Sequence, residues 1–150
     1  EVRTIVVTSS VAGEGKSEVS ANLAAILAES GKRVLLVDAD MRQPRQHHLW
    51  GLINGGGLSN VIVGQDEFSR CHHQVTKYLS VLSAGVQPPS PSALIDSGRM
   101  NTLIQNLLPN YDYIIFDTPP LAGTPDAAVL GWWLALVLWI QAALLLLNLY

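Results

Sequence analysis

The sequence predicts an α/β fold built on a doubly wound, mostly parallel sheet. Three observations lead to this prediction: apolar strand-like runs alternate with helical segments, a glycine-rich loop follows the first run, and an aspartate ends two of the runs. Strands that are separated by helices pair in parallel through right-handed crossovers, so this order of elements predicts such a sheet. The 150 residues are enough for one domain with a sizeable core.

The first half of the chain gives the clearest elements. Residues 4–8 form a short β-branched run, which is typical of a strand buried on both faces. From Lys16 the pattern becomes helical, and Gly31 is expected to end that helix. Residues 34–37 predict a second buried strand, which ends on Asp38. One helical face, which we expect to be buried, contains Val19, Leu23, Ile26 and Leu27, with the small residues Ala21, Ala24, Ala25 and Ala28 around it.

The second half is less regular, and turn residues divide it. The three glycines at 55–57 indicate a flexible turn, and the prolines at 88–91 indicate an extended connection that is not helical. Ser92 is suited to cap the N-terminus of a helix that runs towards Leu108. The remaining expected elements are a short helix at 58–63, a third strand at 79–82 and a fourth strand at 111–116, which ends on Asp117.

Composition and charge exclude some classes of protein. A formal net charge of -3 gives no electrostatic reason to expect a nucleic-acid partner. The single cysteine, Cys71, excludes an internal disulfide and fits a reducing compartment. His72 and His73 lie beside it, but no second cluster has ligand spacing, so we expect a loop here rather than a metal site. The chain opens without a signal peptide and looks like a piece of a longer protein.

The loop between the first strand and the first helix has the composition of a phosphate-binding loop. Phosphate needs converging backbone N–H donors, and glycine lets the main chain curl closely around it at a positive helix N-terminus. Lys16 can reach the β- and γ-phosphates of ATP, and the Ser17 hydroxyl can ligate Mg²⁺. Ser10 replaces the first glycine of the strict pattern, which leaves an ordinary glycine-rich turn as the alternative. The residues expected to bind the nucleotide are Ala12, Gly13, Glu14, Gly15, Lys16, Ser17 and Glu18.

Aspartates directly follow two of the predicted strands. Asp38 and Asp117 should lie near one ligand, because the carboxyl ends of parallel strands meet at the same edge of a sheet. Asp40 follows Asp38 by two residues and should point to the same side of an extended chain. Such carboxylates can bind Mg²⁺ directly or through water. A lone aspartate at a strand end is also an ordinary turn residue, so the prediction depends on finding both together with the loop.

With these motifs the chain resembles the bacterial protein-tyrosine kinases (BY-kinases), P-loop kinases derived from ATPases that control capsule and exopolysaccharide export. Residues 8–17 are similar to their Walker A segment, residues 34–47 to their Walker A′ motif, and residues 111–120 to their Walker B motif. Residues 84–100 include a match to the family's proline-serine-leucine segment. The likeness covers about residues 3–130 and is specific, because several spaced motifs occur in the right order.

The resemblance implies an ATP-dependent protein-tyrosine (auto)kinase that regulates capsular or exopolysaccharide polymerisation and export. Lys16, Asp38 and Asp40 would be catalytic, with Asp38 accepting the proton of the attacking tyrosine hydroxyl. Ser17, Asp40 and Asp117 would hold Mg²⁺. The implied partners are ATP and ADP, a tyrosine on the same or a neighbouring subunit of a homo-oligomer, and a transmembrane activator. That activator would place the domain in the cytoplasm, at the inner face of the plasma membrane.

Further positions carry weaker expectations. Arg42 is expected to brace the loop or a neighbouring subunit, and His47 to lie near the nucleotide or to have a helix-cap or surface role. Glu18 stands where many relatives have a hydroxyl residue, and it either weakens binding or points to solvent. The related partition and division-site ATPases carry a signature lysine where this chain has Val11, which favours the kinases. The family's tyrosine-rich tail is absent, and only Tyr150 ends the chain. A nucleotide-gated ATPase switch without kinase activity, which controls assembly with a membrane partner, is therefore the alternative function.

The C-terminal segment is the largest departure from the family. Residues 132–147 are apolar apart from Gln141 and carry no charge. This stretch is shorter than the roughly 20 residues needed to span a bilayer. We expect a buried strand followed by a short truncated helix, with a membrane-contacting segment or a non-native end as alternatives. The sequence thus predicts a P-loop kinase domain at 1–130, C-terminally incomplete, and an apolar tail of uncertain status at 131–150.

Overall fold

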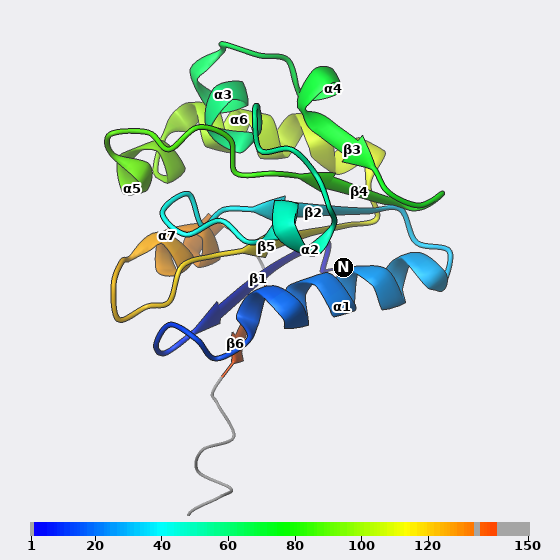
Figure 1. Cartoon of the computed structure of the whole chain (residues 1–150), viewed down its shortest axis with the longest axis horizontal. Helices are drawn as coiled ribbons and strands as arrows, with labels where there is room; N and C mark the ends of the chain where they lie inside the picture. The colour runs from blue at the N-terminus through cyan, green and yellow to red at the C-terminus, as the bar shows by residue number, and fades with distance from the viewer. Residues whose placement is uncertain (1, 134–135, 141–150) are drawn as a thin grey trace, which may run out of the picture.

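The computed structural model describes residues 2–133 and 136–140. In this part of the chain a six-stranded sheet has the order β3-β4-β2-β5-β1-β6. All neighbouring strands are parallel except β3, which pairs antiparallel with β4. The doubly wound, mostly parallel sheet that the sequence predicts is confirmed (Figure 1). The strands are β1 (Thr4–Ser9), β2 (Val34–Asp38), β3 (His72–Gln74), β4 (Leu79–Leu82), β5 (Tyr113–Asp117) and β6 (Leu136–Ile140).

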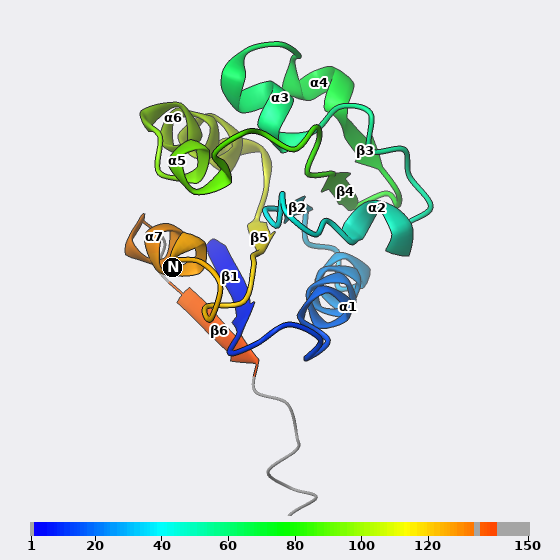
Figure 2. The same ribbon diagram turned by 60° about the vertical axis from the view of Figure 1, so that its left-hand side comes forward.

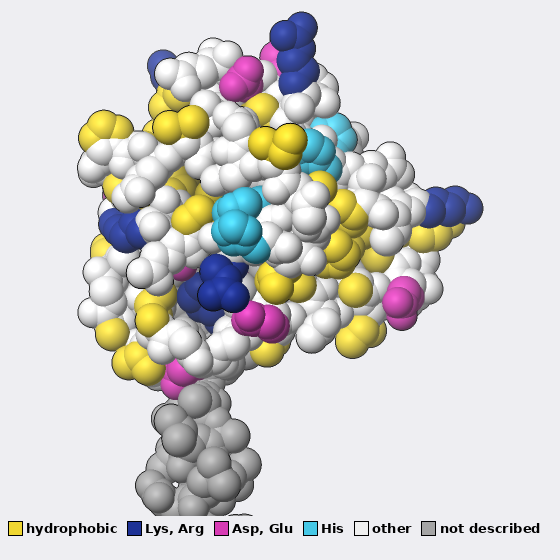
Figure 3. All heavy atoms as spheres, in the orientation of Figure 1, with side chains coloured by type: hydrophobic (Ala, Val, Ile, Leu, Met, Phe, Trp, Pro, Cys, Tyr) yellow, Lys and Arg dark blue, Asp and Glu magenta, His cyan; other side chains and the backbone are white. Residues whose placement is uncertain are grey.

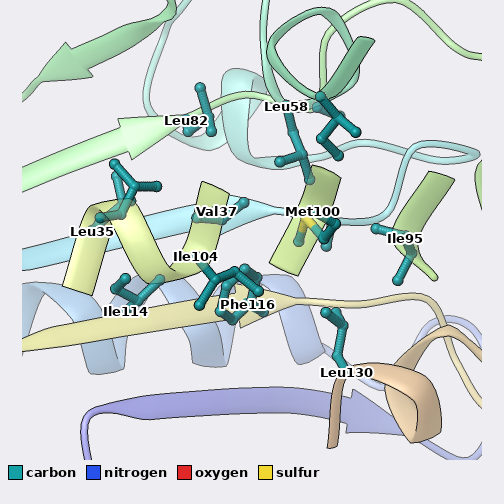
Figure 4. Packing of buried hydrophobic residues seen from close by; sticks show 14 of the residues in the cluster. Leu35, Val37, Leu58, Leu82, Ile95, Met100, Ile104, Ile114, Phe116 and Leu130 are labelled. Carbon is teal, nitrogen blue, oxygen red and sulfur yellow. The ribbon is translucent and has the colours of Figure 1, made fainter. Parts of the chain in front are cut away.

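Helices cover both faces of the sheet, as the two ribbon views show (Figures 1 and 2). Residues alternate along each strand, so Val6 of β1 faces one helical layer while Ile5 and Val7 face the other. The larger cluster, shown in Figure 4, packs Phe116 and its neighbours against α3, α5, α6 and α7. The helices are α1 (Lys16–Glu29), α2 (Gln46–Leu49), α3 (Leu58–Val63), α4 (Phe68–Cys71), α5 (Pro91–Ile95), α6 (Gly98–Leu107) and α7 (Asp126–Trp133), with a 3-10 turn at Leu108–Asn110.

Helix α1 buries a different face from the one that hydrophobicity predicts. Val19 and Ile26 are exposed, with 38% and 63% of their surface accessible. Small residues face the sheet instead: Ser20, Ala24 and Ala28 are buried. Small side chains let the helix backbone approach the sheet closely, and the strands supply the large apolar groups at this contact. The prediction of a buried Val19–Ile26 face was therefore wrong, although Leu23 and Leu27 do pack partly against the sheet.

The single helix expected from Ser92 to Leu108 is two helices. Pro91 is the first residue of α5, a position where its missing N–H costs no hydrogen bond. Because the helix begins at Pro91, Ser92 is already inside it. A second helix, α6, starts after Ser97, whose hydroxyl accepts a hydrogen bond from the Met100 N–H. The N-cap prediction for Ser92 was wrong, because a better placed serine five residues later caps a separate helix.

The segment around Cys71 also differs from the expected loop. Phe68–Cys71 forms the short helix α4, and His72–Gln74 forms the edge strand β3. Cys71 is a buried free thiol. Its burial, and to a smaller extent the negative charge of Asp66, raises the pKa of this thiol. Within the described residues no group of three or more His, Cys, Asp and Glu side chains could hold a metal ion.

Of the three glycines in the turn predicted at 55–57, Gly55 and Gly56 lie in a bend as expected, whereas Gly57 has a different role. Gly57 is buried, and the next two N–H groups bond to the chain after β4: Leu58 donates to the Ser83 carbonyl at 2.8 Å and Ser59 to the Ala84 carbonyl at 3.0 Å. A Cβ at Gly57 would lie 2.1 Å from that Ser83 oxygen and 2.5 Å from the Gly85 nitrogen. The backbones approach so closely that only glycine fits.

This contact predicts a large loss of stability for Gly57→Ala. The added methyl would meet backbone atoms, which cannot rotate away, so the two hydrogen bonds beside it must also be displaced. We expect the free energy of unfolding to fall by at least about 3 kcal/mol in a urea titration. Gly55→Ala is the matched control, because the nearest atom to its Cβ would be Ile53 Cγ2 at 3.6 Å. Equal unfolding midpoints for the two variants would contradict the close approach.

At the other rim of the sheet, part of the C-terminal segment forms a strand. Residues 136–140 pair in parallel with β1, from Leu136 beside Ile5 to Ile140 beside Ser9. The truncated helix expected after this strand lies outside the described residues. Among the helices that the structure describes, none is long and apolar enough to cross a membrane. The division of the chain at residue 130 stays a prediction.

Candidate active site

The predicted site residues meet at one edge of the sheet, where β1, β2 and β5 end. These three strands are neighbours in the order β2-β5-β1. The glycine-rich loop leaves β1 and enters α1, while Asp38 ends β2 and Asp117 ends β5. Asp38 and Asp117 are direct partners in the parallel register of β2 and β5. The topology thus brings together the loop and the two strand-end carboxylates, as the rule for parallel sheets requires.

The backbone of the loop depends on two glycines. Gly13 and Gly15 have φ values of 80° and 78°, in the left-handed region that strains other residues. The Glu14 carboxylate lies inside the loop and accepts hydrogen bonds from Ser10 N–H at 2.9 Å and Val11 N–H at 3.3 Å. Gly15 then caps α1, whose first N–H groups have no acceptor within the helix. Glu14 thus braces the start of the loop, and the first N–H groups of α1 are the donors suited to phosphate.

Lys16 lies beneath this loop among acidic side chains. Its ammonium is 3.2 Å from Asp40 Oδ2 and 3.5 Å from Asp117 Oδ1, and its side chain is almost fully buried. A buried cation between two carboxylates compensates charges that would otherwise be costly to desolvate. Lys16 and the carboxylates predicted to hold Mg²⁺ are thus in direct contact.

Asp38 is fully buried and its carboxylate holds the loop that follows β2. Oδ1 accepts a hydrogen bond from Asp40 N–H at 3.1 Å, and Oδ2 accepts two, from the N–H groups of Arg45 and Gln46, both at 2.9 Å. Burial, and then the nearby charge of Asp117, raises the pKa of Asp38 to about 7. The three N–H bonds act in the opposite direction and are outweighed.

Asp117 has one oxygen bound and one without a hydrogen bond. Oδ2 accepts a hydrogen bond from Gln46 Nε2 at 2.9 Å, whereas Oδ1 is buried without a hydrogen bond and faces the Lys16 ammonium. Burial raises the pKa of Asp117, and the positive charge of Lys16 is the largest effect that lowers it. An anionic oxygen without a hydrogen bond, next to a lysine and a serine hydroxyl, is a suitable ligand position for a hard cation.

Gln46 is a central residue of the site that the sequence did not indicate. It is fully buried, and its Nε2 donates both to Asp117 and, at 2.9 Å, to the Ser17 carbonyl. Its Oε1 accepts the indole N–H of Trp50 at 3.1 Å. A glutamine at such a position does not by itself indicate a functional site, and two of its partners, Ser17 and Asp117, are 29 and 71 residues away in the sequence. Only its place within the Walker A′-like segment could have drawn attention to it.

Arg42 is also explained by the structure. Its guanidinium donates to Asp126 Oδ2 at 2.9 Å and to the Ser92 hydroxyl at 2.8 Å, and that hydroxyl donates to the other Asp126 oxygen at 2.5 Å. Asp126 is buried at the start of α7. Arg42 thus fastens the loop after β2 to α5 and α7, in agreement with the bracing role expected for it. His47 lies in α2, with a buried Nδ1 that has no hydrogen bond.

A pocket of about 260 Å³ opens above these residues. Asp40 contributes to its lining, whereas Asp38 and Asp117 are not part of that lining and have no exposed surface. Glu18 is exposed and lies 3.5 Å from Arg45 in a surface ion pair, which fits the solvent-facing alternative for this carboxylate. In Figure 3 basic, acidic and histidine side chains lie side by side on this face of the molecule. The pocket is lined by Ala12, Gly13, Gly15, Lys16, Ser17, Glu18, Asp40, Gln43, Arg45 and Pro120.

Comparison with known proteins decides the family. The sequence model of the ParA family, described as an NUBPL iron-transfer P-loop NTPase, matches residues 2–132.

The chain belongs to the ParA family of P-loop NTPases.

Two curated proteins that are similar to this chain carry the name tyrosine-protein kinase. It is 41% identical to the putative tyrosine-protein kinase CapB of Staphylococcus aureus over 86% of this chain and 57% of CapB. It is 39% identical to the tyrosine-protein kinase YwqD of Bacillus subtilis over 87% of this chain and 56% of YwqD. The resemblance to bacterial tyrosine kinases is therefore confirmed. This ParA-family chain spans just over half the length of these two relatives.

Solved structures agree with this assignment. The chimerical protein CapA2B2 superposes with a TM-score of 0.90 at 38% identity, covering 94% of this chain and 63% of that one. The kinase domain of the Escherichia coli tyrosine kinase ETK superposes with a TM-score of 0.88 at 35% identity, covering 92% and 55%. The septum site-determining protein MinD of Pyrococcus horikoshii, at 24% identity and a TM-score of 0.75 over 93% and 58% of the two chains, shares the ParA-family fold.

The donor set of the site fits a magnesium-bound nucleotide, which the family implies. Asp117 Oδ1 is a buried carboxylate oxygen without a hydrogen bond, and Asp40 and the Ser17 hydroxyl supply further oxygens close to the loop. Magnesium prefers such hard oxygen ligands and binds them together with phosphate and water. Lys16, next to both carboxylates, is the cation that would face the phosphate oxygens.

Proposed function

We propose that this chain is the nucleotide-binding part of a protein-tyrosine kinase that uses Mg-ATP. The observation that carries the proposal is the buried contact of Lys16 with Asp40 and Asp117 directly beneath the glycine loop. A loop with left-handed glycines suits the phosphates, and the oxygens of Ser17, Asp40 and Asp117 suit the metal. The similarity to relatives named tyrosine-protein kinases supports phosphoryl transfer to tyrosine as the reaction.

In this reaction the loop and Lys16 would bind the phosphates, and Asp38 would accept the proton. Backbone N–H groups of the loop and the Lys16 ammonium bind and neutralise the phosphates, and bound Mg²⁺ supplies further charge neutralisation there. The tyrosine oxygen bonds to the γ-phosphorus while the bond to ADP breaks, and its proton passes to Asp38. Of the two Asp38 oxygens, Oδ1 accepts only one N–H and has a lone pair left, so it is the proposed acceptor. Because Asp38 is fully buried here, the loop after β2 must open for the hydroxyl to reach it.

The substrate and the cellular setting are also proposals. The resemblance to capsule and exopolysaccharide kinases supports a tyrosine on the same or a neighbouring subunit as acceptor. It also supports a transmembrane activator that brings the domain to the inner face of the plasma membrane. Regulation of capsular or exopolysaccharide polymerisation and export would be the outcome.

Following the fate of the γ-phosphate tests the proposal. The chain is incubated with Mg²⁺, γ-labelled ATP and a tyrosine-rich polypeptide, and phosphotyrosine is measured beside free phosphate. We expect labelled phosphotyrosine that EDTA abolishes, because the metal neutralises charge on the transferring group. Release of free phosphate alone would favour the alternative, a nucleotide-gated switch without kinase activity. Failure to bind Mg-ADP in a calorimeter would contradict the site itself.

A further inference from the structure

The side-chain amide of Gln46 joins three parts of the site that are far apart in the sequence. Its Nε2 donates to the Ser17 carbonyl and to Asp117 Oδ2, both at 2.9 Å. Its Oε1 accepts the Trp50 indole N–H at 3.1 Å. An amide has two N–H donors and one oxygen acceptor, so both donors and the acceptor are in use.

These contacts allow only one orientation of the amide. If the amide were flipped, its oxygen would face the Asp117 carboxylate and the Ser17 carbonyl, and its NH₂ group would face the indole N–H of Trp50. Three attractive contacts would then become repulsive in a buried place, where unmatched polar groups are costly. The network therefore locks the Gln46 side chain.

The locked amide determines which Asp117 oxygen is available. Oδ2 accepts the Gln46 N–H, whereas Oδ1, which has no hydrogen bond, keeps both lone pairs and lies 3.5 Å from the Lys16 ammonium. We infer that Gln46 is a positioning residue that holds Asp117 with one oxygen free for the metal and links this carboxylate to Trp50. This inference rests on the proposed function, because it concerns the metal of the nucleotide site.

Trp50 is the outward end of this link. Its ring is half-buried and lines a groove of about 230 Å³ between α1 and α2, together with Glu18, Ala21, Asn22, Ala25 and Leu49. A change of charge next to Asp117 alters the polarisation of the Gln46 amide and hence the hydrogen bond from the indole. The hydrogen bond of the Trp50 indole should therefore change when the metal binds, although Trp50 does not line the 260 Å³ pocket.

The first test compares Gln46→Leu with Gln105→Leu. Both variants make the same change, but Gln105 is exposed on α6. Binding of ADP is titrated at a series of Mg²⁺ concentrations and in EDTA. For Gln46→Leu we expect the Mg²⁺ concentration at half-saturation to rise about tenfold or more, the usual effect of losing an orienting partner. Affinity for ADP in EDTA should change by less than about threefold, since Gln46 contacts no nucleotide-binding N–H group. An unchanged Mg²⁺ requirement, or equal losses with and without metal, would overturn the inference.

A second measurement needs no folded Gln46 variant. The indole N–H signals of the wild-type chain are recorded by NMR, and Trp50→Phe assigns the Trp50 signal by its disappearance. We expect this signal to shift when Mg-ADP replaces ADP in EDTA. If the wild-type chain fails to bind Mg-ADP, the proposed function fails. If it binds with a clear Mg²⁺ dependence and the Trp50 signal does not move, only the role of Gln46 fails.

Discussion

Changing Lys16 to Met is expected to weaken ATP binding by tenfold or more while the fold survives. The substitution keeps the length of the side chain but removes charge-assisted hydrogen bonds to phosphate, each worth about 1.5–3 kcal/mol. A loss of 1.4 kcal/mol corresponds to a factor of ten in affinity. Titration calorimetry with Mg-ATP measures the effect. Lys32→Met, at an exposed lysine beyond the end of α1, is the matched control.

The same variant should also change the nucleotide-free protein. Without the ammonium, Asp40 and Asp117 lose the cation that lies 3.2 and 3.5 Å from them. The Lys16 charge is the largest effect that holds down the pKa of Asp117, so that pKa should rise further in the variant. Circular dichroism should nevertheless show a folded domain. Unchanged ATP affinity in a folded Lys16→Met protein would remove the phosphate-binding role of the loop.

Asp38→Asn should retain ATP binding but lose most phosphotransfer. If Asp38 takes the proton of the tyrosine, its removal should slow the reaction by roughly 10²–10⁴-fold, the usual contribution of a general base. Phosphotyrosine formation under saturating Mg-ATP, with ATP affinity determined on the same sample, measures both quantities. The assay uses the same chain and tyrosine-rich polypeptide as the wild-type measurement, so the two rates are compared directly.

The structure adds a second role for Asp38 that the experiment must separate. An asparagine can still accept the N–H groups of Arg45 and Gln46 on its oxygen, but its NH₂ group then opposes the Asp40 N–H. One unsatisfied donor costs about 1–3 kcal/mol, so the variant should melt at a lower temperature without unfolding. Near wild-type turnover would show that Asp38 only braces the loop. Joint loss of ATP binding and turnover would show that it acts by shaping the site.

Local chemistry explains which features could be predicted from the sequence. The phosphate loop is visible because Gly13, Gly15, Lys16 and Ser17 are residue types that the chemistry itself requires at fixed spacing. Asp38 and Asp117 are visible because each follows a buried strand, and the ends of neighbouring parallel strands are adjacent.

The remaining features depend on contacts between distant segments. Gln46 acquires its role only because the fold brings Ser17 and Asp117 to its side chain. Likewise, the two partners of Arg42, Ser92 and Asp126, are 50 and 84 residues away in the sequence. Hydrophobic periodicity also failed in α1, because the sheet selects small residues such as Ala24 for close packing rather than the more apolar Ile26. The buried face is marked by small residues four positions apart, Ser20, Ala24 and Ala28, and a pattern of large apolar residues does not reveal it.

The position of β6 has a mechanical consequence for the site. Because β6 lies beside β1, the strands that carry the loop, Asp38 and Asp117 each have a hydrogen-bonded neighbour on both sides. A sheet frays from its rims, where a strand is held along one side only. In the described sheet the rims are β3 and β6, so thermal opening begins at strands that contribute none of the proposed site residues. The geometry beneath the phosphates is thus shielded from the most frequent fluctuations of the sheet.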